Sequence, residues 1–360
     1  MEELPLTKRL DANLGYSCNN NCLFCYFSER KNKPGNMSFK SAKGLFSLIR
    51  KCGIDTLEIT GGEATLRSDI FALVSFAKNE LGFRNICIIS NGSGFSEYNF
   101  ARVAKKAGLN EVLISLHGHT GSLHDTLVGR KGAFAGILDS ISNIQEAGMS
   151  CRTNTVITKL NYEYASDISA LINSLGVKMI NYIFFSPLDD AAAINKEIWP
   201  TYSESAPFIK RMIDDFAHKF ELISIKVIPF CFMQGYEKYI TDLFQNIYDP
   251  YEWNFPARIR IRRGKIVHFL AYLYGMALFA DVKRMFRGNC RSLSAESFVR
   301  LQAHRECVKN RSCQYCKYDR ICPGVWKGYA KKFSLNELKA ARGEKIEDVR
   351  YYMNDRFRDL

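Results

Sequence analysis

The chain has 360 residues, of which 47% are hydrophobic and 24% are charged. This composition fits one large or two moderate folded domains and excludes a mainly disordered chain. Lys and Arg number 50 against 37 Asp and Glu, and the resulting net charge of +13 favours an acidic or phosphorylated partner.

The 12 cysteines are expected to be reduced. The N-terminal stretch MEELPLTKRLDANLGYS has no apolar signal core, so we expect a cytoplasmic protein whose thiols are available to metals. The longest apolar run, from Ile266 to Ala280, is too short to span a bilayer and contains His268. We therefore expect this run in a core and expect no membrane association.

Three cysteines, Cys18, Cys22 and Cys25, lie together in the stretch CNNNCLFCY, with no fourth cysteine nearby. A structural zinc site needs four ligands to close its tetrahedron, so three thiols leave one position open. An open position on a metal is available to a ligand or substrate.

Apolar runs rich in β-branched residues alternate with helical patterns. Runs at 55–60, 85–90, 111–115, 153–158 and 179–185 predict buried strands. A helix is expected to begin at Ser38 and to end with Arg50 and Lys51, and another to span Ala133 to Ala147. Such alternation predicts a parallel sheet covered by helices, either doubly wound or a complete or partial barrel.

Polar residues follow three of these strands, where ligands of such sheets bind. Gly61-Gly62-Glu63 follows the first, and paired glycines let a backbone approach a ligand closely, although this triplet is also a common turn. Asn91 follows the second strand. After the third come His117 and His119, candidates for an acid–base or substrate role, with hydrogen bonding inside the loop as the alternative. His124 is expected at a helix cap or on the surface.

The spacing of Cys18, Cys22 and Cys25, with Phe24 before the last cysteine and Gly-Gly-Glu after the next strand, resembles the radical S-adenosylmethionine (radical SAM) superfamily. In that family three thiolates hold three irons of a [4Fe-4S] cluster, and the fourth iron binds the amino and carboxylate groups of S-adenosylmethionine. The resemblance implies reductive cleavage of this cofactor to methionine and a 5′-deoxyadenosyl radical that abstracts hydrogen. A zinc knuckle or unligated thiols are the alternative.

The likeness extends over roughly residues 10 to 190 and implies a partial (β/α)6 TIM-like barrel at residues 10–200. It implies cofactor contacts at Phe24, Thr60, Gly61, Gly62, Glu63, Ser90, Asn91, Ser115 and Asn154. Asn161 matches a second asparagine of a recurring family pattern. His117 stands where many relatives have Asp, so the role of that carboxylate is not carried over.

A second cysteine group, CVKNRSCQYCKYDRICPG, resembles the auxiliary-cluster extensions called SPASM and twitch domains. Their Cys-x2-Cys-x5-Cys core matches Cys313, Cys316 and Cys322, whereas Trp326 stands where the fuller SPASM pattern has a cysteine. The resemblance implies one auxiliary [4Fe-4S] cluster, with Cys307 as the fourth ligand and Cys290 as its competitor. A zinc site of four cysteines is the alternative.

The remaining cysteines are expected to behave as small hydrophobic residues: Cys52, Cys87, Cys151 and Cys231. The auxiliary domain is expected to be a small α+β cap at residues 201–330, followed by a charged helical tail at 331–360. Within the cap, RIRIRRGK from Arg258 to Lys265 predicts a strand with one charged face. Such a strand can pair with a peptide or bind phosphate, or its charged face can simply be solvated.

The resemblance thus implies an oxygen-sensitive radical SAM enzyme that receives electrons from a flavodoxin- or ferredoxin-type donor. A peptide or protein substrate is favoured, because the second half of the barrel and the C-terminal extension resemble peptide maturases. A nucleotide-like or other small-molecule substrate is the first alternative. A non-catalytic metal-binding or nucleic-acid-binding module is the second.

Overall fold

A computed structural model describes residues 4–31, 35–185, 196–261 and 290–353, together with the single positions 264, 269, 273 and 357. The chain divides into two compact units. The barrel unit is Asp11–Ser224, and the C-terminal unit combines Met1–Leu10 with Ile225–Leu360.

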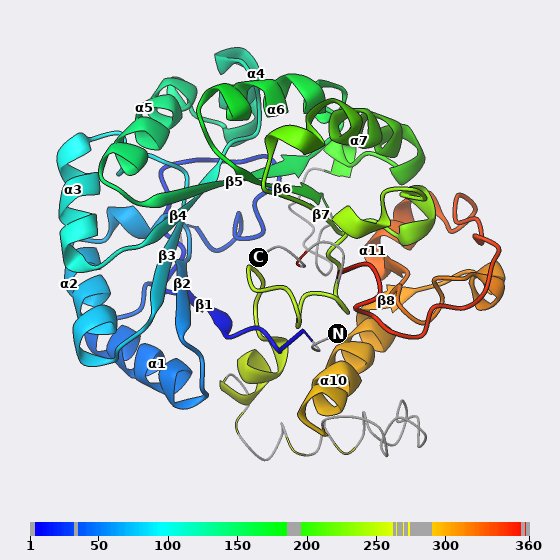
Figure 1. The fold of residues 1–360 in the computed structure, drawn as a ribbon. Coiled ribbons are helices and arrows are strands. Elements are labelled where there is room, and N and C mark those ends of the chain that lie inside the picture. Colours follow the sequence, from blue (N-terminus) through cyan, green and yellow to red (C-terminus); the bar gives the residue numbers. More distant parts are fainter. Residues whose placement is uncertain are drawn as a thin grey trace. The chain divides into compact units, whose positions relative to one another are not determined.

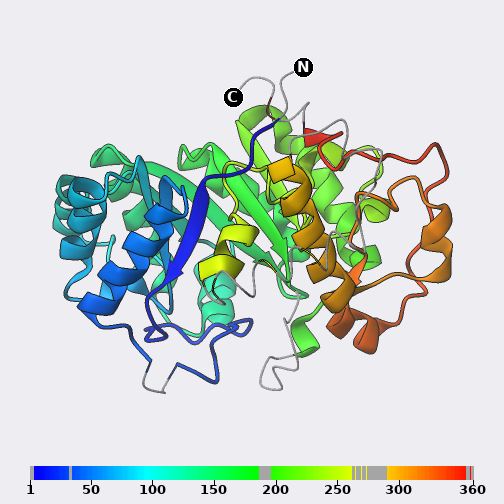
Figure 2. The ribbon, with the colours of Figure 1, turned by 90° about the horizontal axis from the view of Figure 1, so that it is seen from below.

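A seven-stranded sheet runs in chain order from β1 to β7. Its strands are β1 (Arg9–Asn13), β2 (Thr56–Thr60), β3 (Asn85–Ser90), β4 (Glu111–Ser115), β5 (Ser150–Ile157), β6 (Met179–Phe184) and β7 (Leu222–Lys226). The four pairings between β2 and β6 are parallel. The sheet curves, and the helices cover its outer face (Figure 1, Figure 2). The predicted partial barrel of parallel strands is therefore confirmed.

The helices of the barrel unit include the two that were predicted from the sequence, at 38–51 and 133–147. The barrel helices are α1 (Phe39–Lys51), α2 (Ile70–Ser75), the π-helix η2 (Phe76–Glu80), α3 (Tyr98–Ala107), α4 (Gly121–Val128), α5 (Ala133–Glu146), α6 (Ala165–Ser174) and α7 (Tyr202–Phe216). The Ser38 side chain accepts a hydrogen bond from the Ser41 N–H and so caps α1, as expected. In α5 the buried face includes Ile137, Ile141 and Ile144, which lie three or four residues apart.

One buried ion network joins three strands of the sheet. Arg152 of β5 donates from Nη2 to Glu58 Oε1 of β2 at 3.2 Å and from Nε to Glu111 Oε1 of β4. All three side chains are almost completely shielded from solvent. Because a buried charge is stable only when it is paired, these residues specify the register in which the strands assemble.

In the described part of the C-terminal unit the regular elements are α10 (Cys290–Glu306), the antiparallel pair β8 (Cys307–Val308) and β9 (Val325–Trp326), and α11 (Lys327–Phe333). Short 3₁₀ turns occur at η6 (Phe230–Phe232), η7 (Glu237–Tyr239) and η8 (Arg311–Tyr315). Gln245 Nε2 donates to the carbonyls of Ile321, at 3.0 Å, and Val349, at 3.2 Å, so three loops share one buried amide.

The strand predicted from Arg258 is wrong for residues 258–261, because residues 255–261 are helical. Asn254 Oδ1 accepts from the Ala257 N–H at 3.0 Å, which is an N-cap bond, and Pro256 lies in the first turn, where it is tolerated. These helix-start signals override the alternation of charged and apolar residues. Residues 262, 263 and 265 lie outside the described part.

Two further expectations also change. In the apolar run 266–280 the structure describes only Phe269 and Leu273, and both are exposed rather than in a core, with 56% and 47% of their surface accessible. Residues 334–353 are mostly irregular, with short turns, instead of forming the predicted helix, and widely spaced residues such as Leu338 and Val349 are buried. None of the helices searched in the described parts is long and apolar enough to cross a membrane.

Candidate active site

The cysteine loop follows β1 and runs beside the Gly-Gly-Glu turn at the end of β2. The Gly62 N–H donates to the Gly15 carbonyl at 2.9 Å, and the Glu63 N–H donates to the Ser17 carbonyl at 2.8 Å. A Cβ atom at position 62 would lie only 2.1 Å from the Ser17 oxygen, so the close approach requires glycine. The two motifs that were separate in the sequence therefore form one structural feature.

The other side of the cysteine loop contacts the end of α4. The N–H groups of Asn21 and Leu23 donate to the carbonyls of Val128 and Leu127, at 2.8 Å and 2.9 Å. Gly129 ends α4 with φ of 62°, and a Cβ there would lie 2.5 Å from the Asn21 oxygen. The loop is thus held from two sides by backbone contacts, which leaves its thiols in a defined arrangement.

The three thiols of the loop lie close enough to interact electrostatically. Burial raises the pKa of Cys22 to about 12, and Cys25 and then Cys18 add to the rise, so the metal-free thiol is neutral. The N–H groups of Asn20 and Phe27 point at the sulfurs of Cys18 and Cys25, each at 3.4 Å. Hydrogen bonds of this kind stabilise the thiolates that hold iron–sulfur clusters.

The three neighbouring cysteines of the loop supply soft thiolate donors, which suit iron–sulfur clusters. In a [4Fe-4S] cluster each cysteine sulfur binds a different iron. The three-thiol donor set therefore fits a [4Fe-4S] cluster with one iron left free.

The predicted cofactor residues at the ends of β2 and β3 meet around the Glu63 carboxylate. Glu63 is buried and accepts from Thr65 N at 3.1 Å, Thr65 Oγ1 at 2.6 Å, Ser90 Oγ at 2.9 Å and Asn91 N at 2.6 Å. Burial raises the pKa of Glu63, and these bonds oppose the rise. Both carboxylate oxygens are engaged within the chain, so Glu63 joins the two strand ends, and its contact with the cofactor stays a prediction.

Asn91 also connects β3 to the cysteine loop. Its Nδ2 donates to Asn19 Oδ1 at 2.7 Å and approaches Cys18 Sγ at 3.7 Å. Thr60 is the last residue of β2, and its carbonyl accepts from the Leu14 N–H at 2.9 Å, just before the loop. These contacts place Thr60, Gly61, Gly62 and Asn91 beside the cysteines, as the sequence suggested.

Ser115 and Asn154 face each other across β4 and β5. The Asn154 side-chain oxygen is buried and has no hydrogen-bond partner in the described part of the chain. A buried acceptor without a donor costs free energy, which a ligand with hydroxyl or amine donors would recover. This unpaired oxygen is a second indication, independent of the thiols, that the residues fit a polar cofactor such as S-adenosylmethionine.

The two candidate histidines differ in their surroundings. His117 is buried, its ring lies edge-on to Phe24 with centroids 4.6 Å apart, and its Nδ1 accepts from the Val156 N–H at 3.1 Å. Burial, and then His124, hold its pKa well below the ordinary value, so the ring is neutral. His117 therefore supports the cysteine loop through Phe24. His119 lies near Tyr164, with centroids 5.0 Å apart, and an acid–base role for either histidine stays a prediction.

His124 is completely buried rather than on the surface. Its Nδ1 accepts from the His117 N–H at 3.1 Å, and burial lowers its pKa to about 4. It stacks almost parallel to His117, with centroids 5.9 Å apart. The sequence stretch HGHTGSLH did not indicate this burial, because α4 places the third histidine beneath the loop.

In the C-terminal unit the predicted ligands Cys313, Cys316 and Cys322 line one pocket. The fourth cysteine lining it is Cys231, which we had expected to be a small hydrophobic residue. Cys307 instead lies in β8 opposite Trp326, and the side chain of Cys290 lies outside the described residues. Sequence spacing held no signal for Cys231, because it lies far upstream of the others.

Residues 12–175 match the profile of the Radical SAM superfamily. Among curated proteins, the AdoMet-dependent heme synthase of Oleidesulfovibrio alaskensis is 30% identical over 51% of this chain and 46% of its own. A probable GTP 3′,8-cyclase of Saccharolobus solfataricus is 29% identical over 52% of this chain and 58% of its own. The mycofactocin maturase MftC of Mycobacterium ulcerans is 28% identical over 53% of this chain and 51% of its own. The chain thus spans about half the length of these relatives.

Solved structures share the fold at low sequence identity. Native anSMEcpe with bound AdoMet superposes with a TM-score of 0.56 and 13% identity over 97% of this chain and 95% of its own. Methylornithine synthase (PylB) superposes with a TM-score of 0.51 and 15% identity over 69% of this chain and 74% of its own. Together with the cysteine loop, the Gly-Gly-Glu turn and the parallel half-barrel, the profile match identifies residues 12–175 as a Radical SAM superfamily domain.

Proposed function

We propose that the chain is a radical SAM enzyme that cleaves S-adenosylmethionine reductively and modifies a peptide or protein substrate. The observation that carries this proposal is the three-thiol loop held against the Gly-Gly-Glu turn by the Gly62 and Glu63 backbone. A cluster bound by Cys18, Cys22 and Cys25 would supply the electron for reductive cleavage of S-adenosylmethionine, and with it the radical chemistry of hydrogen abstraction.

Different residues of the chain bind the cluster and the cofactor in this proposal. Cys18, Cys22 and Cys25 hold the cluster, and the backbone at Gly61 and Gly62 lies beside them, where it can approach the methionine part of the cofactor. The unpaired Asn154 oxygen, opposite Ser115, accepts a hydrogen bond from a ribose hydroxyl. Phe24, packed against His117, keeps the loop in place.

A peptide substrate is supported by two of the comparisons. The relative MftC is a mycofactocin maturase. The solved structure of native anSMEcpe with bound AdoMet and Cp18Cys peptide shares the fold over 98% of this chain and 95% of its own, with a TM-score of 0.55. The GTP 3′,8-cyclase relative supports a nucleotide substrate as the second candidate. The net charge of +13 favours an acidic electron donor of the flavodoxin or ferredoxin type.

The cleavage proposal is tested with two cysteine variants. After anaerobic reconstitution with iron and sulfide, the protein is incubated with S-adenosylmethionine and dithionite, and 5′-deoxyadenosine is measured by mass spectrometry. Cys22→Ala should abolish the product. Cys52→Ala is the matched control, because Cys52 ends α1 away from the loop, and it should retain the product. Undiminished product from Cys22→Ala would contradict the proposal.

The substrate class is tested by deuterium transfer. Peptides encoded by short reading frames beside the gene are prepared fully deuterated, and deuterated GTP serves as the nucleotide comparison. The proposal expects deuterium in 5′-deoxyadenosine only when a peptide is present. Transfer from GTP alone would establish the nucleotide alternative and overturn the peptide assignment.

A further inference from the structure

Asn181 of β6 is a buried amide whose donor nitrogen has no partner. Only 4% of its surface is accessible, and its Nδ2 makes no hydrogen bond in the described part of the chain. An amide N–H in this position costs free energy, because it has lost its bonds to water and gained none in return. The barrel unit therefore carries, on β6, a donor that an acceptor on a ligand would satisfy.

Asn181 lies beside Asn154 on the concave face of the sheet. The two are register partners in the parallel pairing of β5 with β6, so their side chains leave the same face. Arg152, two residues before Asn154, reaches Glu58 of β2 across this face, while the helices cover the other face (Figure 1). Asn181 Nδ2 does not donate to Asn154 Oδ1, although Asn154 Oδ1 is itself a buried acceptor without a donor. Two unused hydrogen-bonding groups thus lie on neighbouring strands.

The surroundings of Asn181 on this face are uncharged or already paired. Toward the C-terminal ends of β5 and β6 the next register partners are Val156 and Ile183, which are apolar and half-buried. His117 accepts the Val156 N–H, and burial holds its pKa well below the ordinary value, so its ring is neutral. On the other side of Asn154, the guanidinium of Arg152 donates to two carboxylates. The described residues of this face therefore suit a neutral acceptor and offer no unpaired cation to a phosphate group.

We propose that Asn181 binds the substrate, and that its Nδ2 donates a hydrogen bond to a neutral amide carbonyl of a peptide. The inference rests on the proposed function, in which Asn154 binds the ribose of S-adenosylmethionine. The 5′ carbon of the cofactor is attached to this ribose, so a carbonyl held by Asn181 lies beside the carbon at which the radical chemistry starts. Rates depend steeply on such placement. Asn181 thereby favours a peptide over a charged small molecule.

The first test measures stability without any ligand. Asn181→Leu replaces an unpaired amide by an apolar side chain of similar size, so the urea midpoint of the full, metal-free chain should rise. Asn161→Leu is the matched control. Asn161 is also buried, but its amide makes four hydrogen bonds, to Thr158, His117 and Val156, so this variant should have a lower midpoint. A lower midpoint in Asn181→Leu as well would show a structural role and overturn the proposal.

The second test separates the substrate from the cofactor. After anaerobic reconstitution, titration calorimetry gives the Kd for S-adenosylmethionine. Asn181→Leu should leave this Kd unchanged, whereas Asn154→Leu should raise it about tenfold, as the loss of one hydrogen bond does. An equal rise in both variants would mean that both amides hold the cofactor, and it would overturn the assignment of Asn181 to the substrate.

The third test uses the fully deuterated peptides encoded by short reading frames beside the gene. The kcat/KM for deuterium transfer into 5′-deoxyadenosine should fall about tenfold or more in Asn181→Leu. Unchanged transfer would overturn the proposal. Failure of the proposed function is seen separately in the parent chain, as absence of 5′-deoxyadenosine or of any peptide-dependent deuterium transfer.

Discussion

Arg152 is a buried charged residue of the barrel unit whose guanidinium lies between two buried carboxylates. Replacing it in Arg152→Met leaves Glu58 and Glu111 without this partner, and we expect the free energy of unfolding to fall by about 3–5 kcal/mol. Urea titration measures the change. The matched control is Arg84→Met, which breaks the surface pair with Asp55 and should cost less than about 1 kcal/mol. Equal losses in the two variants would contradict the account.

His124 makes the stability of the barrel unit depend on pH. The unfolded chain protonates this ring near pH 6.5, whereas the folded chain does so only at a pKa of about 4, so the unfolded state binds more protons in between. The folded state is therefore stabilised at neutral pH and loses that contribution as the pH falls. From pH 7.5 to pH 5 the loss is about 2 kcal/mol.

The variant His124→Asn isolates this effect, because an amide oxygen can still accept the His117 N–H. Urea titrations at both pH values should show a fall in stability that is about 2 kcal/mol smaller in His124→Asn than in the parent. The exposed His218→Asn is the control and should behave as the parent does. The same pH dependence in all three proteins would disprove the assignment.

Single residues were predictable where function depends on local spacing. Cys18, Cys22, Cys25 and the Gly-Gly-Glu turn follow from the sequence because each motif is short. Cys231 was not predictable, since its partners come from the other end of the C-terminal unit. The four hydrogen bonds that the Glu63 carboxylate accepts within the chain could not be predicted either. Ser90 and Asn91 reach Glu63 only because β2 and β3 pair in parallel.

The junction between α4 and the cysteine loop is an element-scale feature that depends on Gly129. In Gly129→Ala the added methyl would meet the Asn21 oxygen, so the loop must move away from the end of α4. We expect a loss of about 1–3 kcal/mol in unfolding free energy. We also expect less iron at the N-terminal site after reconstitution, measured in a chain that also carries Cys316→Ala.

Gly132→Ala is the matched control for that junction. Its φ of 79° carries a similar backbone strain, but a Cβ there meets nothing within 4 Å. It should lose stability without losing iron. If both variants retain full iron binding, contact between α4 and the loop does not position the thiols.

Elements with clear periodicity were predicted almost to the residue, as α1, β3 and β4 show. β1 was missed because Arg9 and Asp11 look like surface residues, yet both are buried in the structure. The helix at 255–261 was mistaken for a strand because alternation was given more weight than the Asn254 cap. Capping and burial of charged residues depend on neighbours that a local pattern does not contain.

At the scale of the whole molecule, the family profile covers residues 12–175, whereas the fold likeness to anSMEcpe covers 97% of the chain. In the described part of the C-terminal unit, order depends on loop contacts and, as the resemblance to auxiliary-cluster extensions implies, on metal bound by the cysteines that line its pocket. Removing the metal should therefore loosen this unit selectively.

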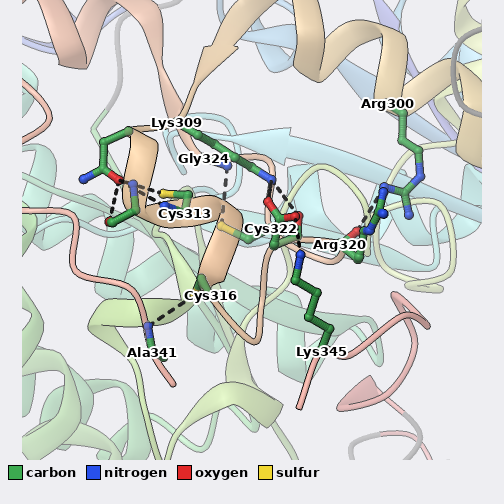
Figure 3. Close-up of polar contacts among 12 residues, drawn as sticks. Arg300, Lys309, Cys313, Cys316, Arg320, Cys322, Gly324, Ala341 and Lys345 are labelled. Atoms are coloured by element: carbon green, nitrogen blue, oxygen red, sulfur yellow. Dashed lines mark hydrogen bonds and ion pairs between the residues drawn. The ribbon is translucent and has the colours of Figure 1, made fainter. Parts of the chain in front are cut away.

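Hydrogen exchange measures that loosening. In the metal-free protein the amides of Gly324 and Ala341, whose N–H groups donate to the sulfurs of Cys322 and Cys316 (Figure 3), should exchange faster than in the reconstituted protein. Amides of β3 and β4 in the barrel unit serve as the internal control and should not change. Unchanged exchange throughout the C-terminal unit would mean that its loops are ordered without metal.

The central claim is that Cys18, Cys22 and Cys25 hold an open cluster, in addition to the auxiliary cluster that the C-terminal resemblance implies. The most direct measurement is the iron, sulfide and zinc content of the anaerobically reconstituted chain, combined with low-temperature EPR of the reduced protein before and after S-adenosylmethionine is added. The account predicts about eight irons per chain and a signal that the cofactor shifts. Zinc without iron, or an iron signal that does not respond to the cofactor, would contradict it.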